Sequence, residues 1–592
     1  MRRPWKVAIA LAAILLAGLL QAPAAPAAAK PLGTKRVNYV VKTKLGKIFV
    51  QVAHAVRGDK IIKAPAIFTY SPYSVLGVPP DQRRNSDASH WNPLGYHRVW
   101  ADVVGTGNSG GCYDYGGNGE KETGAALVRW IAKQKWSTGK VAMIGGSYEG
   151  TTATATAVEK PKGLVTIVPE AAISRWYGYA FSGGIRYFLN NENPPDEGFD
   201  TPLAFDFGFA MPPPHDFVEP DWAERVESTM QPCEEVSHTE HGYDDTPDYD
   251  KFWLERDYLK DARKINIPVL VAHNWGDWNV KQEEGWNLFN ALKSSRKRVL
   301  YFGTRFSGHG TPGGAYEKFV DAWMAHWLKG VDNGIEKAPT FVSQTSDMEG
   351  PGKFLSANRF KTRNVTLYAQ NVPQTTPTGY QWMLMPDKPG KGAPREIAQF
   401  PSTNVNSEVH ANHHSRQNHD WFWFETHGLK HNTRIFGRPK VRIFSKTDRE
   451  WVTFTPTVVD IDPKCHQIVA GQHVGTAPEC LPNALYSVTR GWLDSRYRNS
   501  LAKQRMLKPN KPFGVTVVEK PTDYTFKKGH FIGLSIQTEI NEWSIPKAYP
   551  CSSPDCVFVR VLWEKGQTRL VLPIVNAPKN PADLFQSPGH DH

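Results

Sequence analysis

The chain has 592 residues, more than one compact core accommodates, so its length predicts two or three domains. Hydrophobic residues make up 40% of the chain and aromatic residues 12%, values that are typical of globular proteins and exclude general disorder. The formal net charge is +12, but the basic residues are scattered and form no Lys/Arg block of five or more. We therefore interpret the charge as promoting solubility and predict no nucleic-acid partner.

Residues 1–29 carry the three parts of an export signal. A basic start, an apolar stretch and a small-residue A-x-A cleavage site follow one another, at 2–6, 7–20 and 27–29. The apolar stretch is shorter than the about 20 residues that a membrane-spanning helix needs, so we predict a cleaved signal peptide and not an anchor. The mature protein is expected to be secreted without membrane association, and oligomerisation stays open.

The six cysteines, an even number, suit an oxidising compartment. Their positions predict three disulfide bonds: Cys551 with Cys556 across a short turn, Cys465 with Cys480 around a loop, and Cys112 with Cys233 as the remaining pair. None of these spacings fits a metal site, so structural bridges are expected and no metal is predicted.

Between about residues 37 and 330, short apolar runs alternate with amphipathic ones, a pattern typical of βαβ units around a mostly parallel sheet. Strands are expected at 66–70, 98–104, 141–144, 164–168, 269–273 and 298–302, and helices at 120–134, 148–158, 282–292 and 316–328. From about 181 to 264 this rhythm is interrupted by a stretch rich in Pro, acidic and aromatic residues, which indicates a cap over a site.

After about residue 360 the sequence changes to short Val-, Thr- and Phe-rich runs separated by Pro, Gly and Asn turns. The clearest of these runs are 440–444, 451–459, 512–518 and 531–538. Helical patterns are scarce here, so we predict a β-sandwich of the jelly-roll type at 360–577, followed by a tail at 578–592.

The segment from Lys140 to Gly150 contains an apolar strand that runs into Gly-Gly-Ser-Tyr-Glu-Gly and then a helix pattern. A serine on such a strand-to-helix turn forms a nucleophile elbow, which makes Ser147 the predicted nucleophile. Glycines two residues before and three after it let the strand and helix approach. The Tyr148 backbone N–H would then donate to a developing oxyanion. The spacing departs from G-x-S-x-G because Glu149 stands where the second glycine would be.

A nucleophilic serine needs an orienting carboxylate and a histidine base, which follow it in that order in the α/β-hydrolase fold. Asp277 comes shortly after the strand expected at 269–273, and His309 shortly after the strand expected at 298–302. Because all three residues follow the C-terminal ends of strands, the sequence predicts a Ser147–Asp277–His309 triad. The domain that carries it is predicted to span 30–350.

Tyr73 follows the strand expected at 66–70, where its phenol is placed to donate a second hydrogen bond to the oxyanion. Residues 105–110 formally match the G-x-G-x-x-G dinucleotide fingerprint, but further Gly and Tyr residues delay the helix that this motif requires. No nucleotide cofactor is therefore predicted. The histidines within 410–419 are interpreted as a solvated loop and not as a metal site.

Several motifs together resemble the X-prolyl dipeptidyl-peptidases, whose clan includes the cocaine-esterase-like and α-amino-acid ester hydrolases. The motifs are Gly-Gly-Ser-Tyr-x-Gly around Ser147, the run 166–174 followed by Trp176-Tyr177, the run 277–281, Thr489-Arg-Gly-Trp-Leu493 and Tyr524-Thr-Phe-Lys-Lys-Gly-His530. The resemblance spans nearly the whole mature chain. It implies an α/β-hydrolase domain with a helical cap, a C-terminal jelly roll and the triad given above.

With the export signal at 1–29, the resemblance further implies a secreted serine exopeptidase that releases Xaa-Pro dipeptides from peptide N-termini without a metal or organic cofactor. It also implies that Trp176 and Tyr179 help to form the pocket for proline, and Asn279 is a further candidate for substrate binding. The candidates for binding the substrate's free ammonium are carboxylates: Glu149 beside the nucleophile, and Asp244 and Asp245 in the cap.

Two other hypotheses stay open on the sequence. An ester or acyl-amide hydrolase would use the same triad on a small ester substrate, and dependence on a free substrate amine separates it from the peptidase. A polysaccharide-binding protein built on an inactive hydrolase scaffold is the third hypothesis, which the presence of all three triad residues disfavours.

Overall fold

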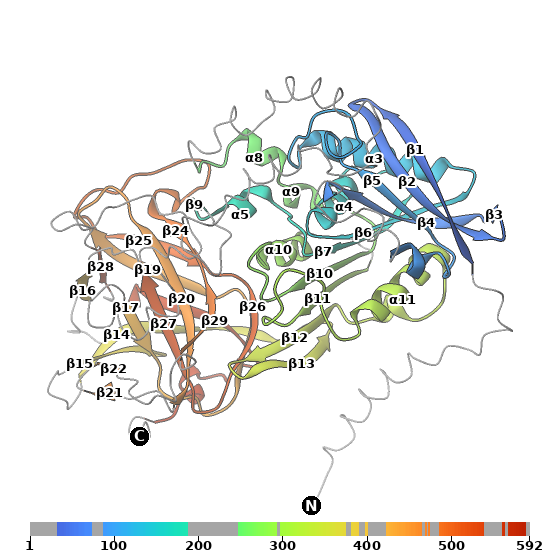
Figure 1. Cartoon of the computed structure of the whole chain (residues 1–592). Helices are drawn as coiled ribbons and strands as arrows, with labels where there is room; N and C mark the ends of the chain where they lie inside the picture. Colours follow the sequence, from blue (N-terminus) through green and yellow to red (C-terminus); the bar gives the residue numbers. More distant parts are fainter. Residues whose placement is uncertain are drawn as a thin grey trace, which may run out of the picture.

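The structure of the chain is a computed structural model (Figure 1). It describes residues 32–73, 87–186, 247–292, 297–373, 380–389, 397–400, 422–463, 468–469, 472–473, 485–537, 559–562 and 566–587. The predicted signal peptide, most of the predicted cap and the histidines within 410–419 lie outside these residues. Figure 1 shows a sheet with helices in the blue-to-green part of the chain and layered strands in the orange-to-red part.

The N-terminal part is built on one sheet with the strand order β1–β2–β5–β4–β6–β7–β10–β11–β12, parallel from β5 to β12. Its strands are β1 (Gly33–Thr43), β2 (Gly46–Arg57), β3 (Lys60–Ile61), β4 (Ala64–Ser71), β5 (His97–Asp102), β6 (Ser137–Gly146), β7 (Leu164–Glu170), β10 (Val269–Asn274), β11 (Arg298–Gly303), β12 (Phe341–Asp347) and β13 (Gly350–Ala357). Its main helices are α3 (Asn118–Lys133), α4 (Tyr148–Val158), α10 (Glu283–Ala291) and α11 (Tyr316–Lys329).

The parallel strands are buried on both faces, which explains why they read as apolar runs and not as alternating patterns. Phe68 and Met143 belong to the core shared with α3, α4 and α10. Their neighbours Ile67 and Ala142 belong to a separate core under α11. Since successive strand residues point to opposite faces, the two cores place helices on both sides of the sheet.

The predicted cap is described only at its two ends. The chain enters it through α5 (Trp176–Ala180), β8 (Phe181–Ser182) and β9 (Ile185–Arg186), and returns through α8 (Lys251–Glu255) and α9 (Leu259–Ala262). The turn between β8 and β9 lies against the C-terminal part, where the Asp494 N–H donates to the Gly183 carbonyl at 2.8 Å. A Cβ on Gly183, whose φ is +59°, would lie 2.1 Å from the Trp492 carbonyl oxygen, so this close approach requires glycine.

The C-terminal part is all β. Antiparallel ladders join β15–β14–β29–β19–β25 and, separately, β17–β27–β20–β23. An apolar cluster that includes Leu367 of β14 and Leu534 of β27 forms their common core. The strands are β14 (Thr362–Pro373), β15 (Tyr380–Met385), β16 (Ile397–Phe400), β17 (Phe422–Glu425), β18 (Thr433–Gly437), β19 (Lys440–Thr447), β20 (Thr453–Ile461), β21 (Ile468–Val469), β22 (Gln472–His473), β23 (Leu485–Arg490), β24 (Leu493–Asp494), β25 (Phe513–Val518), β26 (Thr522–Phe526), β27 (Phe531–Gln537), β28 (Val559–Leu562) and β29 (Arg569–Val575).

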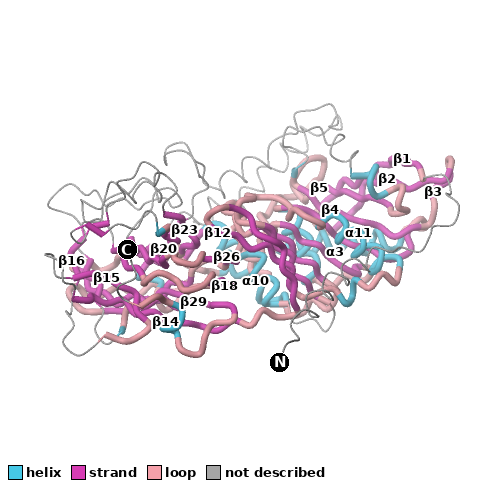
Figure 2. Tube along the Cα trace, turned by 90° about the horizontal axis from the view of Figure 1, so that it is seen from below, coloured by secondary structure: helices cyan, strands magenta, loops and turns pink. Residues whose placement is uncertain are grey.

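The two parts join where β12 pairs with β26 through Ser346 and Tyr524, and both views place these strands side by side (Figure 2). Behind this junction, the Ser343 hydroxyl donates to Asp523 at 2.6 Å and accepts from the Trp275 indole N–H at 3.0 Å. The sandwich therefore contacts the sheet directly at the segment that follows β10.

The predicted fold class, an α/β-hydrolase domain followed by a β-sandwich, is confirmed. Each predicted strand and helix occurs within a few residues of its expected bounds. The exact domain boundaries stay predictions. Cys112 takes part in a disulfide bond, but the other five cysteines lie outside the described residues, so the three pairings are untested. Among the described residues no helix is long and apolar enough to cross a membrane.

Candidate active site

Ser147 stands on a sharp turn between the end of β6 and the start of α4. Its φ of +59° and ψ of −125° are rare for a residue with a side chain, and such strain concentrates at functional sites. The turn is held by backbone hydrogen bonds: Ser147 N–H donates to the Glu170 carbonyl at 2.8 Å, and Thr151 N–H donates to the Ser147 carbonyl at 3.0 Å.

The glycines around Ser147 are required by close packing. A Cβ on Gly145 would lie 2.3 Å from the Glu149 Cβ, and a Cβ on Gly150 would lie 2.7 Å from the Gly145 carbonyl oxygen. The glycine three residues after the serine therefore does what the missing second glycine of G-x-S-x-G would do, which is to bring α4 against β6. The predicted nucleophile elbow is thus present in the structure.

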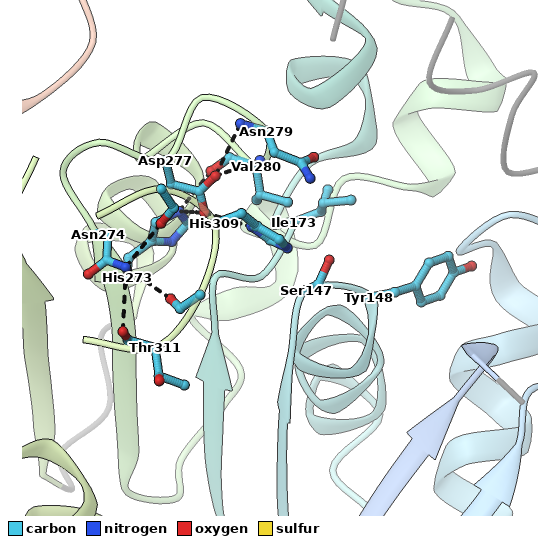
Figure 3. Close-up of polar contacts among 12 residues, drawn as sticks. Ser147, Tyr148, Ile173, His273, Asn274, Asp277, Asn279, Val280, His309 and Thr311 are labelled. Atoms are coloured by element: carbon cyan, nitrogen blue, oxygen red, sulfur yellow. Dashed lines mark hydrogen bonds and ion pairs between the residues drawn. The ribbon is translucent and has the colours of Figure 1, made fainter. Parts of the chain in front are cut away.

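Asp277 and His309 lie on the loops that follow β10 and β11, beside Ser147 (Figure 3). His309 Nδ1 is 2.8 Å from Asp277 Oδ2. Figure 3 shows the His309 ring between Asp277 and Ser147. The structure gives no hydrogen bond between the Ser147 hydroxyl and His309, both of which it describes. In many enzymes this contact tightens only when substrate binds.

The surroundings of Asp277 keep its carboxylate charged although it is fully buried. Burial by itself raises the pKa of Asp277, but hydrogen bonds from His273 and His309 outweigh it and hold the pKa below its ordinary value. Burial likewise lowers the pKa of His309, and the stronger effect of Asp277 raises it. A carboxylate paired with a histidine of raised pKa is the electrostatic arrangement of a general base.

Asn274, the last residue of β10, fixes the loop that carries His309. Its side-chain amide donates to the carbonyl of Gly308 at 3.0 Å and to that of Gly310 at 3.2 Å. The base is therefore anchored on both sides of its own backbone by a residue from the neighbouring parallel strand. Figure 3 shows this amide reaching toward the histidine loop.

The two predicted oxyanion donors lie together. The Tyr148 backbone N–H donates to the Tyr73 hydroxyl at 3.0 Å, so the two groups are adjacent. An oxyanion that replaces this mutual hydrogen bond would accept one hydrogen bond from each. The Tyr148 ring points away from the serine hydroxyl (Figure 3), and its own hydroxyl donates to Glu120 at 2.6 Å. Burial, reinforced by the charge of Asp114, raises the pKa of Glu120 to about 8.

Glu149 supports the loop that carries Tyr73. Glu149 is only 4% exposed, and its carboxylate accepts from the Ser71 hydroxyl at 2.7 Å. Ser71 Oγ in turn accepts from the Tyr73 backbone N–H at 3.2 Å. These contacts connect the elbow to the oxyanion loop, and the role of Glu149 as an ammonium ligand stays a prediction. The alternative ligands Asp244 and Asp245 lie outside the described residues.

Trp176, Tyr179 and Asn279 lie close to the triad, but the two aromatic rings are almost fully enclosed. Trp176 is 0% exposed and donates to the Tyr258 hydroxyl at 2.9 Å. The Tyr179 hydroxyl donates to the Asn279 side-chain oxygen at 3.0 Å, and the Asn279 N–H donates to Asp277 at 3.1 Å. The structure thus connects Tyr179 to the acid of the triad, while the proline-pocket roles stay predictions.

Three residues near the site were not found from the sequence: His273, Asn274 and Lys281. Lys281 is fully buried and donates to the Tyr179 carbonyl at 3.0 Å. Burial, reinforced by the charge of Lys520, lowers the pKa of Lys281 to about 7. His273 and Asn274 end β10, and polar residues at the C-terminal end of a buried strand were the signal that could have identified them.

Comparison with known families accounts for both parts of the chain. Residues 57–307 match the X-Pro dipeptidyl-peptidase (S15 family) model, and residues 352–548 match the X-Pro dipeptidyl-peptidase C-terminal non-catalytic domain. Both parts of the chain thus match models of the X-Pro dipeptidyl-peptidase family. The resemblance inferred from the motifs is confirmed, and the chain is a serine hydrolase.

Relatives of this dipeptidyl-peptidase family align over most of the chain. A protein assigned to the Xaa-Pro dipeptidyl-peptidases in Bacillus anthracis is 27% identical over 538 residues, which cover 83% of this chain and 80% of the relative. The Xaa-Pro dipeptidyl-peptidase of Lactobacillus helveticus is 23% identical and covers 81% of this chain and 69% of its own length.

Solved structures share the fold at low sequence identity. A CocE/NonD family hydrolase from Staphylococcus aureus superimposes with a TM-score of 0.66 at 15% identity. The superposition covers 92% of this chain and 94% of the hydrolase chain. An α-amino acid ester hydrolase gives a TM-score of 0.65 at 16% identity, over 93% of this chain and 98% of its own. These likenesses support the two-domain fold.

Proposed function

We propose that this protein is a secreted serine exopeptidase that releases Xaa-Pro dipeptides from the N-termini of peptides. The observation that carries the proposal is the strained Ser147 beside a His309 that Asp277 holds and keeps basic, in a chain that matches models of the X-Pro dipeptidyl-peptidase family. The export signal expected at 1–29 supports secretion.

Acylation follows from the positions of these groups. Ser147 Oγ attacks the carbonyl carbon after the proline while His309 Nε2 takes the hydroxyl proton. The carbonyl oxygen becomes an oxyanion and accepts hydrogen bonds from the Tyr148 N–H and the Tyr73 hydroxyl. The C–N bond then breaks, the proton on Nε2 passes to the leaving amine, and the dipeptide stays bound to Ser147 as an ester.

Deacylation repeats these steps with water. His309 removes a proton from a water molecule, which attacks the ester carbon, and then returns that proton to Ser147 Oγ as the dipeptide acid leaves. Throughout, Asp277 holds the His309 Nδ1–H and stabilises the imidazolium that forms in each half-reaction. The proposed chemistry uses only groups of the protein and a water molecule.

The test compares Ala-Pro and Gly-Pro anilides with a free N-terminus, the same anilides after N-acetylation, and simple acyl esters. We expect rapid cleavage of the free anilides only, loss of that activity in Ser147→Ala, and no change in Ser356→Ala, which alters an exposed serine of β13. If the esters are hydrolysed and the anilides are not, the protein is an ester hydrolase that uses the same triad, and the peptidase proposal is wrong.

Secretion is tested separately by recovering the protein from the culture medium and sequencing its N-terminus. We expect the mature chain to begin at Lys30, directly after the predicted A-x-A site. A protein retained in the cell with its first residues intact would contradict the proposal.

A further inference from the structure

We propose that His273, which the triad does not include, is a positioning residue that holds the carboxylate of Asp277 in place for His309. The inference rests on the proposed function, because it assigns a role within the same serine-hydrolase site. His273 is the fifth residue of β10, lies four residues before Asp277, and is fully buried.

Both histidines approach the same oxygen of Asp277. His309 Nδ1 lies 2.8 Å from Oδ2, and His273 Nε2 lies 3.2 Å from the same atom. The other oxygen, Oδ1, accepts the backbone N–H groups of Asn279 and Val280 at 3.1 and 3.0 Å. With two donors on each oxygen, the carboxylate cannot turn to follow the His309 ring when that ring takes a proton.

The hydrogen bonds of His273 determine which of its nitrogens carries the proton. Nε2 faces two acceptors, Asp277 Oδ2 and the Val280 carbonyl oxygen at 2.8 Å, so the proton is on Nε2. Nδ1 is buried and has no hydrogen-bond partner among the described residues. A Cβ on Gly285 would lie only 2.7 Å from Nδ1, so the backbone of α10 covers that side of the ring.

His273 is therefore a one-sided donor whose orientation the fold determines. The Phe302 ring of β11 lies 5.4 Å from its ring centre and packs beside it. The hydrogen bond to the Val280 carbonyl keeps His273 Nε2 directed toward both that carbonyl and Asp277 Oδ2. A side chain that only filled space would not need to donate to both Asp277 and the backbone carbonyl of Val280, which lies on the same loop as Asp277.

This arrangement separates two roles within the site. His309 exchanges protons with substrate and is 27% exposed, whereas His273 and Asp277 are completely shielded from solvent. Shielding strengthens the hydrogen bond from His273 because no water competes for Oδ2. If the donor is removed, more of the charge on Oδ2 acts on His309, and the Asp277 carboxylate that holds the His309 ring loses one of the contacts that fix its position.

The experiment compares His273→Leu and His273→Met, which remove the donor, with His273→Gln, whose amide N–H can reach the place of Nε2. Two kinetic measurements are made between pH 5 and 9. The first gives kcat and KM for the Gly-Pro anilide, and the second gives the rate at which a fluorophosphonate modifies Ser147. The modification rate depends on the triad but on no particular substrate. Circular dichroism establishes which variants are folded, and the flexible Met side chain adapts to the site if Leu does not.

We expect kcat to fall about 10- to 100-fold in the apolar variants, with KM within about twofold, because a displaced base slows the chemical step more than binding. The acid limb of both pH profiles should move to higher pH, since Asp277 then raises the pKa of His309 further. His273→Gln should restore most of kcat and return the acid limb toward its original position.

A folded apolar variant with an unchanged acid limb and unchanged rates would overturn the proposal, as would an equal loss in the Gln and apolar variants. Failure of the proposed function is recognised separately, in the protein without substitutions. There the fluorophosphonate would modify Ser147, but Xaa-Pro anilides would not be cleaved. In that case the modification rates and their pH dependence still decide the role of His273.

Discussion

Replacing Lys520 with methionine should destabilise the protein by breaking an ion pair between the sandwich and the α/β-hydrolase domain. Lys520 lies between β25 and β26, and its ammonium is 2.6 Å from Glu283 Oε1 and 2.7 Å from the Ser182 hydroxyl. Arg438, also from the sandwich, reaches the other oxygen of Glu283 at 3.0 Å. Glu283 begins α10, six residues after Asp277, so the pair also bears on the loop that carries the triad acid.

The magnitude follows from the pKa of Glu283. Burial raises this pKa, but Lys520 and Arg438 outweigh burial and lower it from an ordinary 4.5 to about 2. At about 1.4 kcal/mol per pKa unit, the cationic surroundings favour the buried charge by about 3 kcal/mol. Both side chains of the pair are at most 5% exposed. Removing one partner of such a buried pair costs about 3–5 kcal/mol, so we expect a loss of about 3 kcal/mol.

The pH dependence has a defined sign. Because folding lowers the pKa of Glu283, its contribution is fully present above pH 4.5 and disappears as the pH falls toward 2. The difference between Lys520→Met and the unmodified protein should therefore be largest near pH 7 and smaller at pH 3.

The assay is urea unfolding followed by tryptophan fluorescence at pH 7 and pH 3. The matched control is Lys264→Met, because Lys264 forms a half-exposed ion pair with Asp261 within the α/β-hydrolase domain. Exposed pairs contribute about 0–1 kcal/mol. A Lys520→Met loss no larger than that of the control, or one that is the same at both pH values, would refute the reasoning.

Other predictions concern the site and two buried histidines of the sheet, His54 on β2 and His97 on β5. Asp277→Asn should lower kcat/KM about 10⁴-fold, because the amide favours the wrong tautomer of His309; anilide hydrolysis measures it, and a loss below tenfold would contradict the assigned role. Tyr73→Phe removes one oxyanion donor and should lower kcat about 10²- to 10³-fold with little change in KM, so a change confined to KM would argue against that role. Burial lowers the pKa of His54 to about 3 and of His97 to about 4. As the pH falls, these histidines take up protons in the unfolded chain before they do so in the folded protein, so the free energy of unfolding should decrease between about pH 7 and pH 4. Differential scanning calorimetry measures this as a falling melting temperature, and a constant melting temperature over this range would contradict the prediction.

Local sequence patterns were sufficient to place most of the secondary structure. The strands β4, β6, β7, β10 and β11 are continuous apolar runs because both faces of the sheet are covered, and their lengths separate them from the helices. The sequence also predicted that Ser147, Asp277 and His309 would meet, because each follows the end of a parallel strand in the order that this fold imposes, and the structure brings them together. Their catalytic roles stay predictions. The glycines at 145 and 150 indicated the elbow even though their spacing was unusual.

The tertiary structure decided everything that depends on contacts between distant segments. The sequence alone does not indicate that His273 shares an oxygen of Asp277 with His309, because residues four apart on a strand and its following loop meet only if the loop folds back. The elbow motif does not indicate that the Glu149 carboxylate accepts a hydrogen bond from Ser71, which is 78 residues away in the chain. Lys520 and Glu283, 237 residues apart, form a pair that no local pattern predicts. Periodicity and motif order follow from short-range backbone geometry, whereas the partners of buried charges depend on how separate elements pack together.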